Sequence, residues 1–185
     1  MTMNKTVKKQ IADLGSADDK VRMDALRNLL RVTESKVDWV YDVWDHLLEK
    51  MDHENSYQRA IAVKLLCNLA KSDVENRLGT SLDCLLAHTR DEKFVTSRQC
   101  IQSIWKTALT NKPNREKVLK HLEKRFAECA PEKHYNLIRR DIIQSLLSLH
   151  KEEKDDVLIT KVQSLITKEQ DMKYRKQYEA LLSAK

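Results

Sequence analysis

Arginine returns at nearly constant intervals along this 185-residue chain, and this period restricts the fold more than any other feature. The successive intervals are 37, 39, 41 and 36 residues. Each arginine opens a segment with similar apolar spacing, such as Val21-Arg22-x-x-Ala25-Leu26-x-x-Leu29. Sequence periods of about 20 to 50 residues are typical of proteins built from stacked copies of one unit. The series consists of Arg22, Arg59, Arg98, Arg139 and Arg175.

The segments between these arginines also have the spacing of amphipathic helices. One of them carries Val40, Trp44, Leu47 and Met51, which fall on a single helical stripe. With only 2 glycines and 2 prolines, the chain has few residues suited to hairpins or wide loops. An all-α fold is therefore predicted, built from five helical hairpins. Their expected ranges are 4–33, 36–71, 73–110, 113–150 and 155–183.

A single hairpin of this kind cannot bury its apolar stripe alone, so neighbouring hairpins must stack. Acidic turns precede the repeated arginines, as in Asp18-Asp19 before Arg22 and Asp91-Glu92 before Arg98. An acidic turn followed by such an arginine helix, recurring near every 40 residues, resembles the HEAT repeat family, which is related to armadillo repeats. The resemblance covers essentially the whole chain, although Tyr178 stands where a small residue is usual.

This resemblance implies one domain over residues 1–185, an α-solenoid in the form of a right-handed superhelix. It also implies that the second helix of each hairpin lines a concave surface. Members of the family use that surface to bind other macromolecules, usually proteins and sometimes nucleic acid.

Two roles are open for the five repeated arginines: a row of phosphate-binding cations, or ion pairs that hold the stack together. A cation in the first turn of a helix opposes the helix dipole unless acids compensate it. Because acids precede each arginine, we expect the second role, with these residues acting as structural arginines.

Positions one, five and nine residues after each repeated arginine point away from the apolar stripe. Five of these fifteen positions are basic and none is acidic. They predict a mildly basic, hydrogen-bonding concave face that suits an acidic or polar partner. The candidate contact residues are Arg27, Arg31, Lys64, Asn68, Gln99, Ser103, Thr107, Arg140, Gln144 and Lys176.

Trp39 and Val43 share a face of the predicted helix 37–51 that differs from the face of Trp44. They are either an exposed anchor for a partner or part of a broad buried arc, and the two-layer stack favours burial. Four single cysteines are expected to be reduced thiols in the apolar core. These are Cys67, Cys84, Cys100 and Cys129.

The sequence contains no motif that predicts catalysis, metal binding or a cofactor. The six histidines form no His-Glu-x-x-His motif, and Gly15 and Gly79 alone cannot build a phosphate-binding loop. We therefore expect a non-catalytic binding module or scaffold without a cofactor. One enzymatic alternative is a HEAT-like DNA glycosylase that removes alkylated bases, although no catalytic residue of that class matches a position here.

A protein partner, acidic in character, is the first expectation for what the concave face binds. Nucleic acid is the alternative, because the net charge is +6. Self-association is a third, because the C-terminal hairpin presents Tyr174, Tyr178, Leu181 and Leu182 without a following polar cap. The absence of a signal sequence and of a long apolar run predicts a cytoplasmic protein without membrane insertion.

Overall fold

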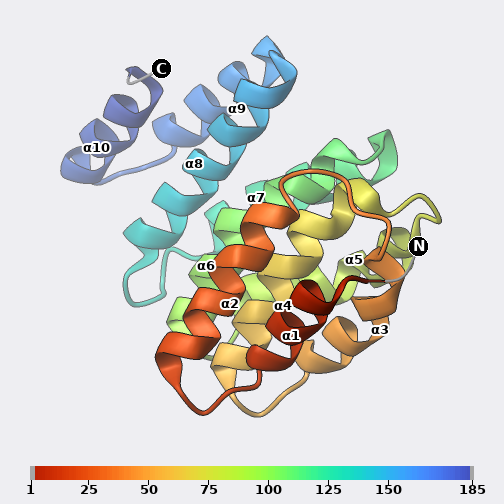
Figure 1. Ribbon diagram of the computed structural model, residues 1–185. Helices are drawn as coiled ribbons and strands as arrows, with labels where there is room; N and C mark the ends of the chain where they lie inside the picture. The colour runs from red at the N-terminus through yellow and green to blue at the C-terminus, as the bar shows by residue number, and fades with distance from the viewer. Residues whose placement is uncertain (1–2, 184–185) are drawn as a thin grey trace.

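A computed structural model describes residues 3–183, and every regular element in that range is helical (Figure 1). The α-helices are α1 (Lys5–Asp13), α2 (Asp19–Val32), α3 (Val40–Met51), α4 (Ser56–Leu69), α5 (Arg77–Ala87), α6 (Phe94–Ile104), α7 (Lys112–Glu128), α8 (Tyr135–Glu153), α9 (Asp156–Thr167) and α10 (Met172–Ser183). Three short 3-10 helices extend α4, α5 and α6, namely η1 (Ala70–Ser72), η2 (His88–Arg90) and η3 (Trp105–Leu109). Within the described part of the chain, no helix combines the length and the apolar character needed to cross a membrane.

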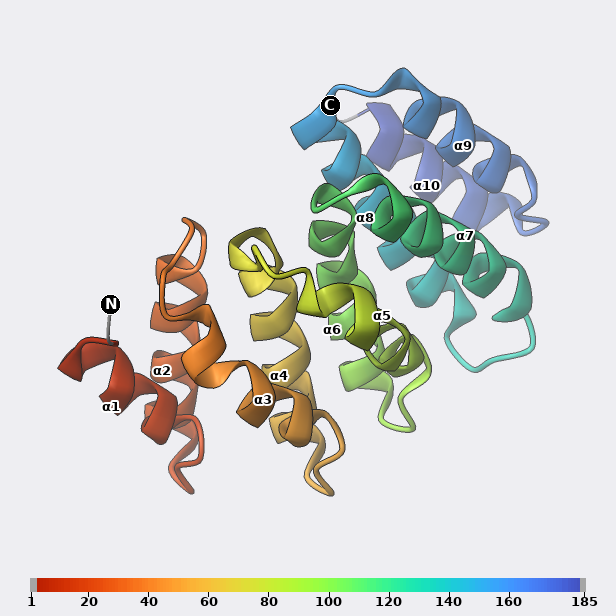
Figure 2. The same ribbon diagram turned by 90° about the vertical axis from the view of Figure 1, so that its right-hand side faces the viewer.

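The helices pack as five successive pairs, from α1 with α2 to α9 with α10. Each even-numbered helix also packs against the next even-numbered helix, from α2 against α4 to α8 against α10. Figure 2 shows the pairs following one another from the N-terminal to the C-terminal end. We call α2, α4, α6, α8 and α10, with η1 and η3, the second-helix side of the molecule.

Short polar side chains fix where many of the helices begin. The side chains of Asn4, Asp18, Asn55, Asn111 and Asp155 each accept a hydrogen bond from a backbone N–H in the first turn of a helix. Such caps satisfy donors that the helix itself leaves free, and each typically contributes about 1 kcal/mol. The chain therefore encodes its helix starts locally, with little use of glycine.

One apolar core runs through all five pairs, from Val7 in α1 to Tyr178 in α10. Tyr178 fills the position where a small residue is usual, and its hydroxyl donates a hydrogen bond of 2.9 Å to the backbone carbonyl of Asn136. Trp39 is only 7% exposed and Val43 is buried, so this face packs into the core. Trp105 is partly buried against the same core.

The cysteine prediction is wrong at one of its four positions. Cys67, Cys100 and Cys129 are buried, but Cys84 is exposed on α5, and all four are free. The buried residues of α5 include Leu78, Leu82 and Leu85. Cys84 lies two residues after Leu82, so it falls on the opposite side of the helix.

Several helix boundaries differ from the expected ones; for example, α5 begins at Arg77 and not near residue 73. Helix α3 begins at Val40, because Trp39 adopts a non-helical conformation as the residue before it. Helix α7 begins at Lys112, so that Pro113 occupies its first turn, where no N–H is required. Helix α8 continues to Glu153 and ends where Lys154 takes a left-handed conformation with φ 56°.

Replacing Trp39 by Ala tests whether this residue belongs to the core. Removal of a buried aromatic side chain typically costs about 3 to 5 kcal/mol, so the urea midpoint of unfolding should fall sharply. Val95→Ala is the matched control, because Val95 is 61% exposed and its truncation should change stability by less than about 0.5 kcal/mol. A Trp39→Ala protein as stable as the control would contradict this packing.

Candidate anion-binding surface

The three central arginines of the series bind carboxylates that belong to the next helix pair. Arg59 donates to both oxygens of Asp91, with Nε–Oδ2 and Nη2–Oδ1 distances of 2.7 and 2.8 Å. Arg98 makes the same two-bond contact with Asp141 in α8, at 2.6 and 3.0 Å. Arg139 donates to Glu169 at 2.8 Å. Each guanidinium therefore joins its own pair to the following one.

Among residues 3–183, the two terminal arginines donate hydrogen bonds only within their own pairs, although the Arg22 guanidinium also lies 5.5 Å from the centre of the Tyr57 ring in α4. Arg22 donates to Asp19 and to the backbone carbonyl of Ser16. Arg175 donates to the backbone carbonyls of Thr167 and Glu169. All five repeated guanidinium groups thus have partners inside the protein, and they do not form a row of free cations.

Asp91 shows how strongly one of these contacts is held. Burial acts to raise the pKa of its carboxyl group. Hydrogen bonds from Arg59, from the backbone N–H of Lys93 and from His88 outweigh burial and lower the pKa to about 2. Asp91 is therefore ionised at neutral pH, and its negative charge balances the positive charge of the Arg59 guanidinium.

The predicted contact residues do not form one uniform surface. The exposed ones are Arg27, Arg31, Arg140, Gln144 and Lys176. Arg27 pairs with Asp24 on the same helix, at 2.9 Å. The half-buried ones are Lys64, Gln99 and Ser103.

The prediction is wrong for Asn68 and Thr107, which are buried. Asn68 donates hydrogen bonds to the carbonyl of Leu30 at 3.0 Å and to the hydroxyl of Thr33 at 3.1 Å, and so ties α4 to the end of α2. Thr107 donates to the carbonyl of Ile104 at 2.7 Å. Neither side chain is available to a partner.

The reason for the Thr107 error is the 3-10 helix η3. Side chains three residues apart eclipse each other in a 3-10 helix, so Thr107 lies over the buried Ile104. Lys106 takes the half-buried place instead, and its Nζ donates to the Asn68 side-chain oxygen. A spacing rule for α-helices misses Lys106, and no local signal in the sequence marks the change of helix type.

Three lysines of the second-helix side come from α4, η1 and η3, which pack against one another, and we call Lys64, Lys71 and Lys106 the lysine cluster. Burial lowers the pKa of Lys64, and the charge of Lys106 lowers it further. Burial also lowers the pKa of Lys106, and the charge of Lys71 adds to that effect. Lys71 donates to the backbone carbonyl of Glu34 at 2.7 Å.

Little negative charge is present to balance this cluster. Residues 56–72 and 94–111 contain no aspartate or glutamate. In residues 3–183, no carboxylate forms an ion pair with Lys64, Lys71 or Lys106; the carboxylate of Glu34 acts on Lys106 only at longer range. Burial raises the pKa of the neighbouring Cys67 thiol to about 12, so this thiol stays neutral. Lys64 and Lys106 have lost part of their hydration on burial, and a bound anion can compensate for this loss.

The same side of the molecule has a hollow of about 530 Å³ between α8 and α10. Gln144, Ser148 and Leu181 line it, together with Lys151 and Lys154 at the end of α8. Cations thus recur at the C-terminal ends of the second helices, at Arg31, Lys71, Lys106 and Lys151.

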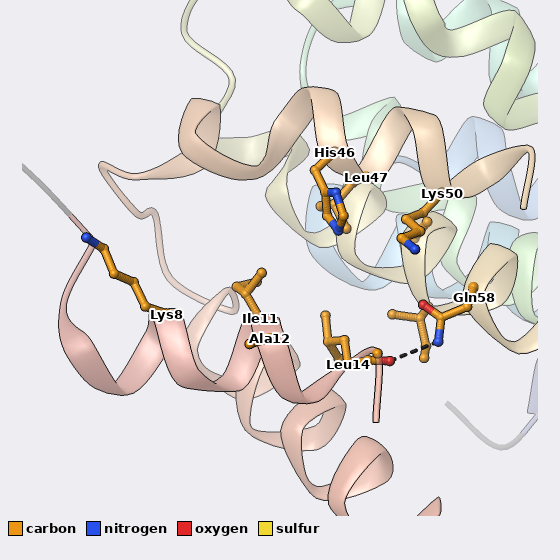
Figure 3. A pocket seen from close by; sticks show the side chains of 11 residues that line it. Lys8, Ile11, Ala12, Leu14, His46, Leu47, Lys50 and Gln58 are labelled. Carbon is orange, nitrogen blue, oxygen red and sulfur yellow. Dashed lines mark hydrogen bonds between the residues drawn. The ribbon is translucent and has the colours of Figure 1, made fainter. Parts of the chain in front are cut away.

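A different pocket, of about 360 Å³, lies between α1, α3 and α4 (Figure 3). Ile11, Leu47 and Ile61 give it apolar walls, and the Gln58 side chain crosses one end to donate to the Leu14 carbonyl at 2.9 Å. His46 stands there without a second histidine, a cysteine or a carboxylate among the lining residues. This arrangement offers no nucleophile and base pair and no set of metal ligands.

In a comparison with models of known protein families, no model matches this chain, and no curated protein matches it either. The function is therefore inferred from the residues and their contacts. In the C-terminal hairpin, Tyr178 is buried, whereas Tyr174, Leu181 and Leu182 are only partly buried. Self-association through these residues stays a prediction.

Changing Asp91 to Asn tests the contact with Arg59. Its carboxylate stabilises the fold above its unfolded pKa of 3.8, and this contribution is lost as pH falls through about 2. At pH 7 the variant should lose at least about 2 kcal/mol of unfolding free energy, and its stability should depend less on pH between about 5 and 2. Urea unfolding at several pH values measures both effects.

Glu92→Gln is the matched control for Asp91→Asn. The Glu92 side chain is 72% exposed and lies 3.5 Å from the same guanidinium, so its neutralisation should have little effect. Equal stability of the two variants at pH 7 would show that the Arg59–Asp91 contact does not matter.

Changing Lys64 to Met tests whether the lysine cluster is under electrostatic strain. A lysine whose pKa is lowered on folding destabilises the fold while it is charged, and this penalty disappears as pH rises to the unfolded value of 10.5. Lys64→Met should therefore raise the thermal midpoint at pH 7, by the equivalent of about 0.5 kcal/mol. The difference from wild type should shrink towards pH 10.5. Lys176→Met, on exposed α10, should leave the midpoint unchanged; a lower midpoint for Lys64→Met would refute the strain.

Proposed function

We propose that this chain is a non-catalytic binding module, a HEAT-like α-solenoid whose second-helix side binds an acidic segment of another protein. The succession of helix pairs, joined by an arginine at three of its four junctions, supports the solenoid. The lysine cluster carries the assignment of the binding side. Three cations lie there in acid-free segments, while the repeated arginines beside them are already paired.

The character of the surface favours a protein segment over a purely electrostatic partner. Trp105 is partly buried beside the cluster, and Lys106 lies 5.7 Å from the centre of its ring. Leu181 and Leu147 line the hollow near α10. Apolar side chains interleaved with lysines suit a peptide that carries both acidic and apolar residues.

The proposed mechanism is recognition by a surface that is already ordered before binding. Asn68 accepts a hydrogen bond from Lys106 and is itself bonded to the end of α2, so the position of Lys106 is fixed by contacts from α2 and α4. A partner then loses its own freedom on binding, but the module loses little.

Nucleic acid remains the second candidate, because exposed cations continue onto α8 and α10 at Arg140, Lys151 and Lys176. A duplex held through several phosphates should lose affinity steeply as salt increases. A salt titration with a short DNA duplex therefore separates this candidate from the acidic protein segment.

Capture from the native lysate with matched charge variants tests the proposed function. Wild type and a Lys8→Glu/Lys50→Glu control, altered at the α1–α3 pocket, should retain the same protein partner. Lys64→Glu/Lys106→Glu should lose it, because two attractive charges become repulsive. The retained protein should also survive nuclease treatment.

Two results would argue against this function. Retention of the same partner by Lys64→Glu/Lys106→Glu would place the contact elsewhere. Loss of the partner after nuclease treatment would favour the nucleic-acid candidate.

A further inference from the structure

At the seam between the second and third helix pairs, α4 packs against η3, and Lys106 bonds to Asn68, which lies one helical turn after Lys64. Lys64 comes from the middle of α4, whereas Lys106 comes from η3, and both are half-buried. The acidic residues that compensate Arg59 and Arg98 are bound two-fold by those guanidinium groups. Asp91 and Asp141 are therefore not free to form ion pairs with Lys64 or Lys106.

Asn68 determines what the seam can still bind. Its side-chain oxygen accepts from Lys106, and its nitrogen donates to Leu30 and Thr33. These contacts occupy both N–H groups of the Asn68 amide and one lone pair of its oxygen. The Lys106 ammonium group has three N–H donors and uses one of them here. Lys106 keeps donors for a ligand, and the Lys64 side chain has no hydrogen-bond partner among residues 3–183.

The number of charges distinguishes between two kinds of anion. Lys64 and Lys106 together carry two positive charges, and Lys71 stands beside them as a third. A single carboxylate supplies one negative charge. A phosphate monoester supplies about 1.5 to 2 negative charges at pH 7 and three strong acceptor oxygens, so it can accept from both lysines at once.

We propose that the seam formed by Lys64 and Lys106 binds the phosphate of a phosphorylated serine or threonine in the partner segment. This proposal rests on the proposed function, because it names the group by which the second-helix side recognises its partner. Partly buried ammonium groups attract a phosphate more strongly than fully hydrated ones, because less water screens the interaction. Lysine serves here as a point charge, which needs no planar, two-bond geometry.

Titration with O-phosphoserine, followed by ³¹P line broadening at constant ionic strength, tests the seam alone. Wild type and Lys176→Met should bind this probe, with inorganic phosphate as a second probe. Lys64→Met and Lys106→Met should each bind at least about tenfold more weakly, the typical effect of losing one charged hydrogen bond. Glutamate should bind more weakly than O-phosphoserine to wild type.

Weaker binding by Lys64→Met cannot be attributed to unfolding, because this variant should fold at least as stably as wild type. Equal binding of O-phosphoserine by wild type, Lys64→Met and Lys106→Met would overturn the proposal. So would equal affinity of wild type for glutamate and O-phosphoserine.

Phosphatase treatment of the lysate before capture separates failure of this inference from failure of the proposed function. Loss of the partner after treatment is the expected result. Retention of the partner after treatment would overturn the phosphate proposal and leave an acidic, unphosphorylated segment as the ligand. Loss on nuclease treatment alone would overturn it in favour of nucleic-acid phosphates.

Discussion

The hydrogen-bonded ion pair between one second helix and an acid of the next pair is the contact on which the rest of the structure depends. A helix pair exposes apolar surface on both sides and must be covered by its neighbours. Hydrophobic contact alone is non-directional and allows neighbouring helices to slide. Two parallel hydrogen bonds, as between Arg98 and Asp141, accept only one relative position. The arginines therefore set the register of the three junctions from the second pair to the fifth.

That register also determines which charges remain for other molecules. Asp91 and Asp141 are already bound by arginines, and α4 and α6 contain no acidic residue that could pair with Lys64 or Lys106. Asn68, held by the end of α2, then brings Lys106 into place. The lysine cluster is thus a consequence of how the pairs stack, since Lys64 and Lys71 come from the second pair and Lys106 comes from the third.

The repeated arginines and the apolar stripes were sufficient to predict an all-helical chain of paired helices, because both signals are local and recur five times. The candidate surface was harder to predict. Asn68 and Thr107 follow the expected spacing, yet neighbouring elements bury them. The spacing rule missed Lys106 because η3, which packs against α7 and α8, turns more tightly than an α-helix. Cys84 was also mispredicted, because the burial of its thiol depends on which side of α5 the residue occupies.

The central claim is that the second-helix side, and not the α1–α3 pocket, receives an acidic partner. The most direct measurement is a titration of the ¹⁵N-labelled protein with a short glutamate-rich peptide, followed by amide chemical shifts. The account predicts that the largest shifts lie around Lys64, Asn68 and Lys106. Shifts confined to the pocket around Ile11 and Lys50, with none at the lysine cluster, would contradict it.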